Sequence, residues 1–538
     1  MPRLPSIAED ALPGAEPEGA PCAGLGVAPV FEKIIFVAYF ATLLVLAAYG
    51  CHRYVLVYML YRYRKQRAQA SEQRFAEQDL PRVTVQLPIF NERYVVDRLI
   101  DCVAALDYPR DRMEIQVLDD SIDDTTEIAA RKVEEWKAKG LDITLIHRTD
   151  RTGYKAGALE NGLKHAKGEL VAIFDADFVP DADFLRSTVH HFTKKEVGLV
   201  QMRWGHLNRD YSLLTRAQAV LLDGHFVVES PARFRAGRFF NFNGTAGIWR
   251  KRAIEEAGGW EHDTLTEDMD LSYRAQMKGW RFIYLDDLTA PAELPAQMAA
   301  FKTQQHRWAK GQTQTCLKLF KPVMNAELPF RIKLEAFFHL TGNFCYLLMV
   351  LLSMLMLPMM LVRIRMGDWQ LGYFFDMSLF MAASVSVIWF YAVSQYEGYK
   401  DWKSRLWYFP LVLALGIGMC INNTRAVLEA LFGHESPFVR TPKHALGSGD
   451  AQKHGWRGSR YVSSFKLKNL LTLVELGMGA YFVVVVAIAF WHQLWVSGAL
   501  LSLFMIGFFW VGGLTLMHGR GKGAAPTEEA GGTEIAAG

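Results

Sequence analysis

Two acidic clusters in this 538-residue chain have the residue types and spacing to hold a divalent cation or a nucleotide. Asp175 and Asp177 flank one alanine directly after an apolar run, and Asp119 and Asp120 follow an earlier apolar run. Carboxylate oxygens suit Mg²⁺ or Mn²⁺, which share the rest of their coordination shell with a substrate diphosphate. Each cluster alone is equally compatible with a turn or a helix cap. Together they favour a site, because clustered carboxylates repel one another unless a cation or donor neutralises them.

Two further segments have side chains suited to a nucleotide sugar. Pro88, Asn91 and Glu92 belong to a loop after the first apolar run, where a plain turn is the alternative interpretation. Lys155 and Gly157 open an amphipathic segment. A helix N-terminus that carries a lysine suits a diphosphate, whereas a solvated surface lysine is the alternative.

The Thr266-Glu267-Asp268 segment, which follows a Gly-Gly-Trp turn, supplies two candidate catalytic carboxylates. In an inverting sugar transfer, a carboxylate removes the proton of the acceptor hydroxyl as that oxygen attacks the anomeric carbon. A capping box at a helix start is the alternative interpretation. In the company of the other acidic clusters we favour catalysis, with Asp268 and Glu267 as the candidates.

The Gln304-Gln305-His306-Arg307-Trp308 segment lies in an amphipathic stretch just before a long apolar one. Gln304 is a candidate nucleotide-sugar ligand, and Arg307 could pair with a departing diphosphate. Trp308 could stack on a sugar face, although Trp and Arg are also common membrane anchors. Phe242-Asn243-Gly244 could line an acceptor site, and a strand followed by a turn is an equally simple interpretation.

The segment that carries these motifs reads as alternating strands and helices. The expected strands are 83–87, 115–118, 143–146 and 170–174, and the expected helices are 95–105, 125–139 and 156–166. This alternation predicts an α/β fold with a buried parallel sheet. The acidic clusters then lie at the carboxyl ends of strands, where open α/β sheets bind ligands.

Long apolar stretches on both sides of this segment predict a membrane protein. Residues 34–60 are long enough to cross about 30 Å of hydrocarbon. The basic residues that follow them predict a cytoplasmic globular segment. Further spans are expected at 334–361, 373–394, 470–491 and 494–516. Residues 406–432 become polar in their second half and precede a basic loop, so an interfacial helix and five crossings are expected, with six as the alternative.

The composition excludes several function classes. A formal net charge of +3 gives no case for nucleic-acid binding. The six cysteines form no CxxC pair, which argues against zinc and against a disulfide framework. The start of the chain lacks the pattern of a signal peptide.

The expected domain organisation is a disordered N-terminus at 1–30, a membrane helix at 31–61, a catalytic domain at 81–320, two membrane helices at 334–395, an interfacial helix with a loop at 403–468, two membrane helices at 469–518 and a disordered tail at 519–538.

In this order, the motifs resemble the D, DxD, TED and QxxRW series of processive family 2 glycosyltransferases, which include cellulose, hyaluronan and chitin synthases. The match covers about residues 81–320 and the membrane layout, and it is specific only as a combination. The segments 87–92 and 304–308 are most similar to the cellulose-synthase-like A and C branches, which make mannan, glucomannan and β-1,4-glucan backbones.

This resemblance implies a GT-A fold, an inverting reaction and a nucleotide-activated sugar. It implies Asp119 near the nucleotide, Asp175 and Asp177 around the metal, Asp268 as base, and Trp308 at the acceptor terminus. A further segment resembles the FxVTxK gating loop of cellulose synthases, with Arg440 in place of Val. Its candidate residues are Phe438, Thr441 and Lys443.

We therefore expect a processive hexosyltransferase that elongates and translocates a β-linked glycan from UDP-glucose or GDP-mannose, with Mg²⁺ or Mn²⁺. The expected location is a membrane, the bacterial inner membrane in particular, with accessory export proteins as possible partners. A lipid-linked transferase that adds one sugar is the first alternative. An inactive scaffold or export component is the second.

Overall fold

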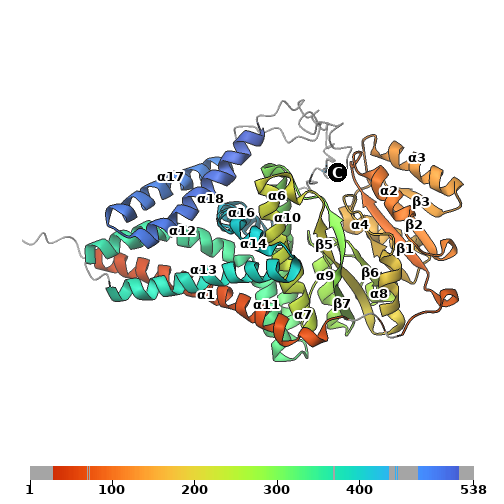
Figure 1. Cartoon of the computed structure of the whole chain (residues 1–538), viewed down its shortest axis with the longest axis horizontal. Helices are drawn as coiled ribbons and strands as arrows, with labels where there is room; N and C mark the ends of the chain where they lie inside the picture. The colour runs from red at the N-terminus through yellow and green to blue at the C-terminus, as the bar shows by residue number, and fades with distance from the viewer. Residues whose placement is uncertain are drawn as a thin grey trace, which may run out of the picture.

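The computed structural model describes residues 28–68, 71, 73–366, 370–434, 441, 443, 445 and 470–519. Both termini predicted as disordered lie largely outside these residues, as do Phe438 and most of the basic loop before residue 470. Along its longest axis the molecule has two parts, a domain built on a β-sheet and a set of long helices (Figure 1).

A seven-stranded sheet forms the centre of the globular domain, with the strand order β3-β2-β1-β4-β6-β5-β7. Its strands are β1 (Val83–Ile89), β2 (Met113–Asp119), β3 (Asp142–His147), β4 (Leu170–Ile173), β5 (Val197–His206), β6 (Gly247–Arg250) and β7 (Arg281–Ala292). All neighbouring pairs are parallel except those of β6, which runs antiparallel to β4 and β5. The sheet is thus mixed rather than purely parallel, and its parallel strands end at one edge.

Helices cover both faces of the sheet, because successive strand residues point to opposite sides. Leu170 and Ala172 of β4 pack into one core and Val171 and Ile173 into the other. The first core is closed by α2 (Val96–Ala104), α3 (Thr125–Ala138) and α5 (Phe184–Thr188). The second is closed by α4 (Tyr154–His165), α8 (Lys251–Glu256) and α9 (Glu267–Met277).

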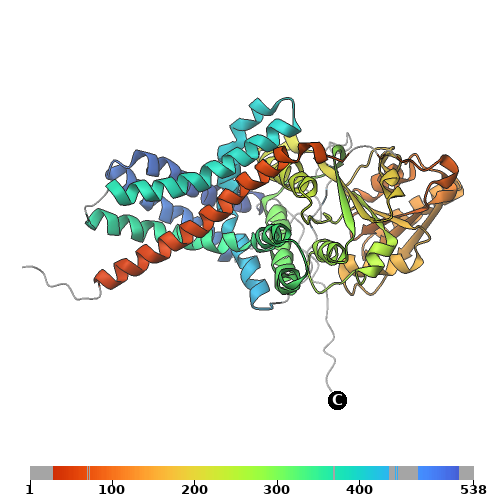
Figure 2. The same cartoon turned by 90° about the horizontal axis from the view of Figure 1, so that it is seen from below.

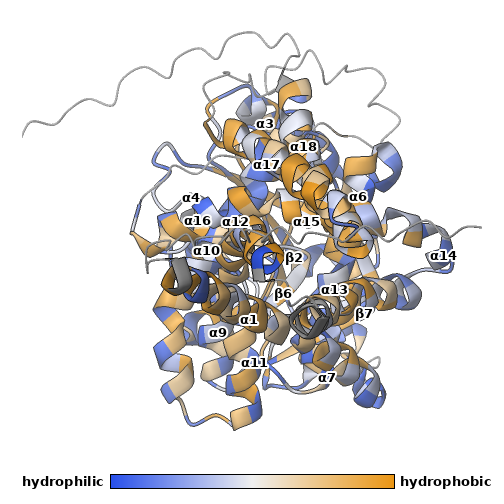
Figure 3. Ribbon diagram, turned by 90° about the vertical axis from the view of Figure 1, so that its left-hand side faces the viewer, coloured by the Kyte–Doolittle hydropathy of each residue, from blue (hydrophilic) through white to orange (hydrophobic). Residues whose placement is uncertain are grey.

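Five long apolar helices extend away from the domain, roughly along the long axis (Figure 1). They are α1 (Ala28–Arg62), α12 (Phe344–Met366), α13 (Gln370–Gly398), α17 (Leu470–Trp491) and α18 (Trp495–Gly519). Figure 3, which looks at this end of the molecule, shows mostly hydrophobic residues on these helices. Each contains a span of 21–33 residues that is apolar enough to cross a membrane. Helix α12 differs from the expected 334–361, because α11 (Phe330–Thr341) ends before α12 begins.

A sixth apolar segment, residues 402–431, runs in a different direction. It consists of α14 (Trp402–Arg405), α15 (Phe409–Gly418) and α16 (Cys420–Leu431). Helix α16 is seen end-on in Figure 1, and the segment runs across the long axis in Figure 2. Of its apolar window 61% is buried, against 28–39% for the other five. This is the direction expected of a helix along a membrane surface, and five crossings stays our prediction.

The ends of the long helices alternate between the two sides of the set. Arg365 at the end of α12 pairs with Glu32 near the start of α1, at 3.2 Å, on the side away from the sheet. At the other side, His518 near the end of α18 accepts a hydrogen bond from the backbone of Met298 in the globular domain. The N-terminal end of α1 and the C-terminal end of α18 therefore lie on opposite sides.

The domain meets the long helices through α10 (Met298–Asn325). Lys302 of this helix lies 2.7 Å from Glu475 of α17, and both side chains are buried. The carbonyl of Lys302 also accepts a hydrogen bond from Asn422 of α16. Because removal of one partner leaves a buried charge without compensation, this ion pair fixes α10 against α17.

We expect Glu475→Leu to lower the free energy of unfolding by about 3–5 kcal/mol, since Lys302 would remain buried without a carboxylate. Thermal unfolding of the purified protein in detergent measures this change. The matched double variant Lys302→Met with Glu475→Leu should recover most of the loss. A double variant as unstable as the single one would contradict the assigned role of the pair.

Candidate active site

A cavity opens at the edge of the sheet where the parallel strands end, between the sheet and α10. Most of the residues that we singled out from the sequence line it. They are Pro88, Glu92, Asp120, Lys155, Asp175, Asp177, Asn243, Gly244, Thr266, Glu267, Asp268, Gln304, Arg307, Trp308, Thr441 and Lys443. Segments that are more than 300 residues apart in the chain thus meet in one place.

Asp175 and Asp177 lie in the turn that follows β4, and each carboxylate faces a lysine. Lys155 Nζ lies 2.5 Å from Asp175 Oδ1, and Lys443 Nζ lies 2.5 Å from Asp177 Oδ2. Burial opposes the charge of Lys155, yet the Asp175 carboxylate raises the pKa of this lysine. The turn is fixed by Thr245, whose hydroxyl accepts a hydrogen bond from the Asp175 backbone. Each of the two carboxylates therefore holds a cation at the cavity wall.

Asp119 and Asp120 differ in their contacts. The Asp119 carboxylate is fully buried and bonds to its surroundings, through Thr126 Oγ1 at 2.7 Å and His147 Nδ1 at 2.8 Å. Asp120 lines the cavity and is held by Arg148 at 2.6 Å. The Asp119 carboxylate thus holds the loop after β2 through buried hydrogen bonds. Its contact with a nucleotide stays a prediction.

Asn91 also acts on this loop rather than on the cavity wall. Its backbone lies in the left-handed region with a φ of 52°. Its side-chain oxygen accepts a hydrogen bond from the backbone of Ile122, and its own N–H donates to Ser121. These bonds join the loop after β1 to the loop after β2.

Glu267 and Asp268 occupy the first turn of α9 and face the cavity. Burial, together with the neighbouring Glu267 carboxylate, raises the pKa of Asp268 above its usual range, although Lys155 opposes the shift. Burial likewise raises the pKa of Glu267. A carboxylate with a raised pKa is suited to accept a proton near neutral pH.

Helix α10 presents Gln304, Arg307 and Trp308 to the cavity, since residues i, i+3 and i+4 share one helix face. Burial lowers the pKa of Arg307, while the surrounding carboxylates, Glu267 first, favour its charge. His306 lies on another face, 3.2 Å from Glu429 of α16. One face of α10 thus lines the cavity, and another face contacts α16.

The segment with the two catalytic candidates packs directly on α10 at Gly311. A Cβ at this glycine would lie 2.8 Å from the backbone nitrogen of Thr266 and 2.7 Å from its methyl group. Thr266 Oγ1 lies 3.1 Å from Thr315 Oγ1, and Gln314 accepts a hydrogen bond from the backbone of Leu265. Gly311 therefore sets how closely Asp268 approaches the α10 face.

The Phe242-Asn243-Gly244 segment has two roles. Phe242 is fully buried and packs edge-on against Trp249, at 5.7 Å between ring centroids. Asn243 and Gly244 line the cavity. Gly244 has a φ of 77°, and a Cβ there would lie 3.1 Å from Asp268 Oδ2. The backbone at Gly244 thus forms the wall beside Asp268.

Several cavity residues were not singled out from the sequence. Trp204 and His206 at the end of β5, and Glu293 after β7, are among them. The Trp204 ring lies 6.4 Å from the Trp308 ring, which gives the cavity two aromatic walls. Arg151 lines it four residues before Lys155. The usable signal was their position, because β5 and β7 are parallel strands whose carboxyl ends meet the same edge.

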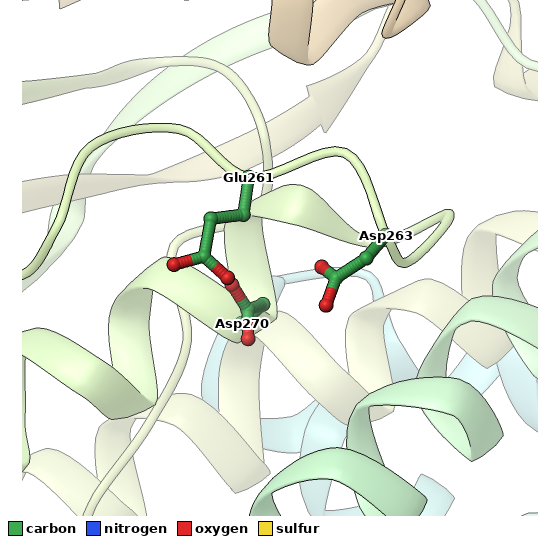
Figure 4. A group of neighbouring side chains, drawn as sticks. All are labelled: Glu261, Asp263 and Asp270. Carbon is green, nitrogen blue, oxygen red and sulfur yellow. The ribbon is translucent and has the colours of Figure 1, made fainter.

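Another acidic group, Glu261, Asp263 and Asp270, brings its carboxylates within 4.8 Å of one another (Figure 4). Lys318 Nζ bonds to all three, at 2.8 Å from Asp263 and 3.0 Å from Asp270. Arg274 adds a second cation, 2.6 Å from Asp270. This group is an ion-pair network in which two cationic side chains bind all three carboxylates.

The cavity combines cations, carboxylates and aromatic rings in one place. Lys155, Arg307 and Lys443 are suited to anionic phosphate groups. Asp268 is a candidate base, and the two tryptophan rings are suited to a sugar face. This geometry fits transfer of a sugar from a nucleotide diphosphate to a hydroxyl group.

Comparison with known proteins agrees with this assignment. Residues 81–311 match the family described as "Glycosyltransferase like family 2". The chain is 36% identical over 464 residues to glucomannan 4-beta-mannosyltransferase 2 of Arabidopsis thaliana, which covers 82% of this chain and 83% of the relative. It is also 36% identical over 414 residues to glucomannan 4-beta-mannosyltransferase 1 of Oryza sativa subsp. japonica, with 74% and 76% covered.

Among solved structures, the chain is similar to the mannosyltransferase PcManGT from Pyrobaculum calidifontis, solved with GDP-Man and Mn²⁺. The identity is 21%, the match covers 76% of this chain and 99% of that one, and the TM-score is 0.49.

The protein is thus a nucleotide-sugar-dependent hexosyltransferase with a GT-A fold, integrated into a membrane by its apolar helices. It belongs to the cellulose synthase superfamily of family 2 glycosyltransferases, whose members include these β-glycan synthases. The predicted family, fold and enzyme class are confirmed. The relatives also favour elongation of a β-linked polysaccharide over the single-sugar alternative.

We expect Gly311→Ala to lower kcat by about 100-fold, because a shift of about 1 Å in a catalytic group has effects of this size. The added methyl group must push the Thr266 segment, and Asp268 with it, away from α10. Initial rates of sugar transfer measure the effect. Gly416→Ala is the matched control, since its Cβ would meet nothing within 4 Å. Equal rates for both variants would show that the close approach is dispensable.

Proposed function

We propose that this enzyme elongates a β-1,4-linked mannan or glucomannan with GDP-mannose as its main donor. The observation that carries the proposal is the single cavity in which Asp268, the Asp175–Asp177 pair and the Arg307–Trp308 face meet. The mannosyl specificity is supported by the relatives, which are glucomannan 4-beta-mannosyltransferases. UDP-glucose is the second candidate donor, because the cationic residues that line the cavity suit the diphosphate that both donors share.

In the proposed reaction, Asp268 accepts the proton of the acceptor hydroxyl as that oxygen bonds to the anomeric carbon of the donor. The bond from that carbon to the diphosphate breaks, and the nucleoside diphosphate leaves with the electron pair. Arg307 and Lys155 stand within the same cavity and would stabilise the charge that develops on the leaving oxygen. Attack on the face opposite the leaving group gives inversion. Trp308 would support the acceptor sugar through its ring.

Asp175 and Asp177 would hold a divalent cation, Mg²⁺ or Mn²⁺. Their carboxylate oxygens are hard donors at the sheet edge, and both residues line the cavity that would receive the diphosphate, so they fit such an ion. Lys155 and Lys443 each pair with one oxygen of these carboxylates, so an ion would bind the second oxygens or displace the ammonium groups. When bound, a divalent cation supplies charge stabilisation to the departing diphosphate.

The membrane helices place the cavity next to the apolar part of the molecule. Helix α10 carries the cavity residues on one face and contacts α16 and α17 on others. A growing glycan could therefore pass from the cavity toward the long helices. The basic residues after α1 support a cytoplasmic catalytic domain. The bacterial inner membrane stays our prediction.

We expect Asp268→Asn to reduce polymer formation by at least about 100-fold, because the acceptor would lose its general base. The neutral side chain keeps its size, so the affinity for GDP should change little. Incorporation of labelled mannose and titration with GDP measure the two quantities. Near-native polymer formation by this variant would contradict the assignment of Asp268 as the general base.

A panel of nucleotide sugars, followed by digestion with β-mannanase and with β-1,4-glucanase, tests the polymer itself. We expect label from GDP-mannose in a product that β-mannanase degrades. A product that resists β-mannanase, or that forms only from UDP-glucose, would contradict the proposed specificity.

Chelation by EDTA should abolish transfer, and Mn²⁺ or Mg²⁺ should restore it, because the diphosphate would lose its counter-charge. The variant Asp177→Asn should need a several-fold higher ion concentration. As a control, Asp263→Asn removes a carboxylate from the network around Lys318 and should leave the ion requirement unchanged. Full activity in EDTA would contradict the metal assignment.

A further inference from the structure

Another cavity, of about 500 Å³, opens beside the end of α1, and we call it the juxtamembrane cavity. Its lining comes from the residues just after α1, from η4 (Val189–Thr193) with Lys194 beyond it, from α7 (Ser230–Arg235) and from the starts of β5 and β7. Figure 1 shows the red end of α1 beside α7 and β7. Segments that are distant in sequence thus meet where the first membrane helix enters the globular domain.

The juxtamembrane cavity is separate from the active site. Val197 opens β5 and Arg281 opens β7, and both residues line this cavity. The active-site cavity lies at the other ends of the same two strands, at His206 and Ala292. Because β5 has 10 residues, the two cavities are separated by about 30 Å of strand. A ligand in the juxtamembrane cavity therefore does not contact the residues assigned to sugar transfer.

The lining of this cavity is cationic. Among the described residues that form it none is acidic, and four carry a positive charge: Lys65, Arg67, Lys194 and Arg281. Acidic side chains outside the lining hold the two arginines, with Asp286 at 3.0 Å from Arg67 and Glu196 at 3.4 Å from Arg281. The ammonium groups of the two lysines have no ion-pair or hydrogen-bond partner in the described part of the chain. Two uncompensated positive charges therefore line one cavity.

A buried histidine adds an unpaired polar group to the two lysines. His191 lines the cavity and is 7% exposed, and its ring makes no hydrogen bond to any described residue. Neither ring nitrogen is fully shielded from solvent. Burial lowers the pKa of His191, and the neighbouring His190 and Lys194 lower this pKa further. The ring is therefore neutral near pH 7 and offers one N–H donor from a position fixed by packing.

The orientation of the membrane helices does not account for this charge. Basic residues directly after α1 follow the rule that cytoplasmic loops are positive. Lys194, Arg281 and His191 instead belong to the globular domain, far along the chain from α1. Because the fold brings cations from both sources around one cavity, the arrangement is suited to hold an anion.

The position of the cavity indicates which anion this is. Lys65 lies just beyond the apolar span Val30–Arg62, at the level where lipid headgroups meet water. Anionic headgroups in the cytoplasmic leaflet attract lysine and arginine residues placed next to a membrane helix. The half-buried apolar residues Phe234 and Ile283 also line the cavity, which suits the less polar part of a lipid.

We propose that the juxtamembrane cavity binds the phosphate headgroup of an anionic phospholipid. Lys65 and Lys194 pair with the phosphate oxygens, His191 donates a hydrogen bond, and Phe234 and Ile283 contact the glycerol backbone. The bound lipid joins the end of α1 to the amino edge of the sheet at the membrane surface. This site is independent of the donor sugar and of the polymer made.

The test uses the purified full-length protein in dodecyl maltoside micelles that contain either phosphatidylglycerol or phosphatidylcholine with the same acyl chains. Native mass spectrometry measures the lipid that each protein retains. Phosphatidylglycerol should bind at least about tenfold more tightly, because choline neutralises the phosphate charge. Lys65→Gln and Lys194→Gln should each weaken phosphatidylglycerol binding by about fivefold. His191→Phe, which keeps the ring size, should weaken this binding by about tenfold.

The sequence neighbours of the two lysines are matched controls. Arg64 and Lys195 are exposed cations that do not line the cavity, so Arg64→Gln and Lys195→Gln should keep native affinity for phosphatidylglycerol. The thermal unfolding midpoints of Lys65→Gln and Lys194→Gln should stay native, since neither ammonium group has a partner among the described residues.

Three results would overturn the inference. The first is equal retention of the two lipids, and the second is an equal loss of affinity in Lys65→Gln and Arg64→Gln, which indicates unspecific attraction. The third is displacement of phosphatidylglycerol by millimolar inorganic phosphate, which shows that the cavity takes a free phosphate. None of these measurements depends on sugar transfer, so a failure of the proposed function is distinguishable from a failure here.

Discussion

Repulsion among carboxylates is the constraint on which the rest of this site depends. Asp175, Asp177, Glu267 and Asp268 all line one cavity, where their like charges repel one another. Lys155, Arg307 and Lys443 come from three different parts of the chain and supply the opposing charge. The fold must therefore bring the start of α4, helix α10 and the segment that carries Lys443 to one sheet edge. A donor diphosphate and its counter-ion would therefore find cationic and anionic side chains already in place in the cavity.

Helix α10 converts this arrangement into a fixed geometry. Its cavity face carries Arg307 and Trp308, and Gly311 one turn later admits the segment that holds Asp268. Arg307, Trp308 and Asp268 are thus all positioned by one rigid helix, α10. Positions held by a helix are more precise than positions held by loops, which suits a reaction sensitive to small displacements.

The sequence allowed the acidic edge of the sheet to be predicted, because Asp175 and Asp177 directly follow a buried strand. The i, i+3, i+4 spacing in 304–308 likewise gave one helix face. Strand β6 was not predicted, because its four residues, Gly247–Arg250, are too few to show an alternation of apolar and polar side chains. Trp204 was missed because a tryptophan inside a strand resembles core. The Lys302–Glu475 pair joins residues far apart in the chain, and no local pattern indicates it.

The contacts on the outer faces of α10 have a consequence for engineering. Lys302 bonds to α17, and His306 and Lys310 bond to Glu429 of α16. A soluble fragment cut after residue 320 would keep the motifs up to Trp308 but lose these partners, and would expose unpaired charges beside apolar surface. The catalytic unit of this enzyme is therefore not modular. Exchange of specificity between relatives should transplant α10 together with the helices on which it rests.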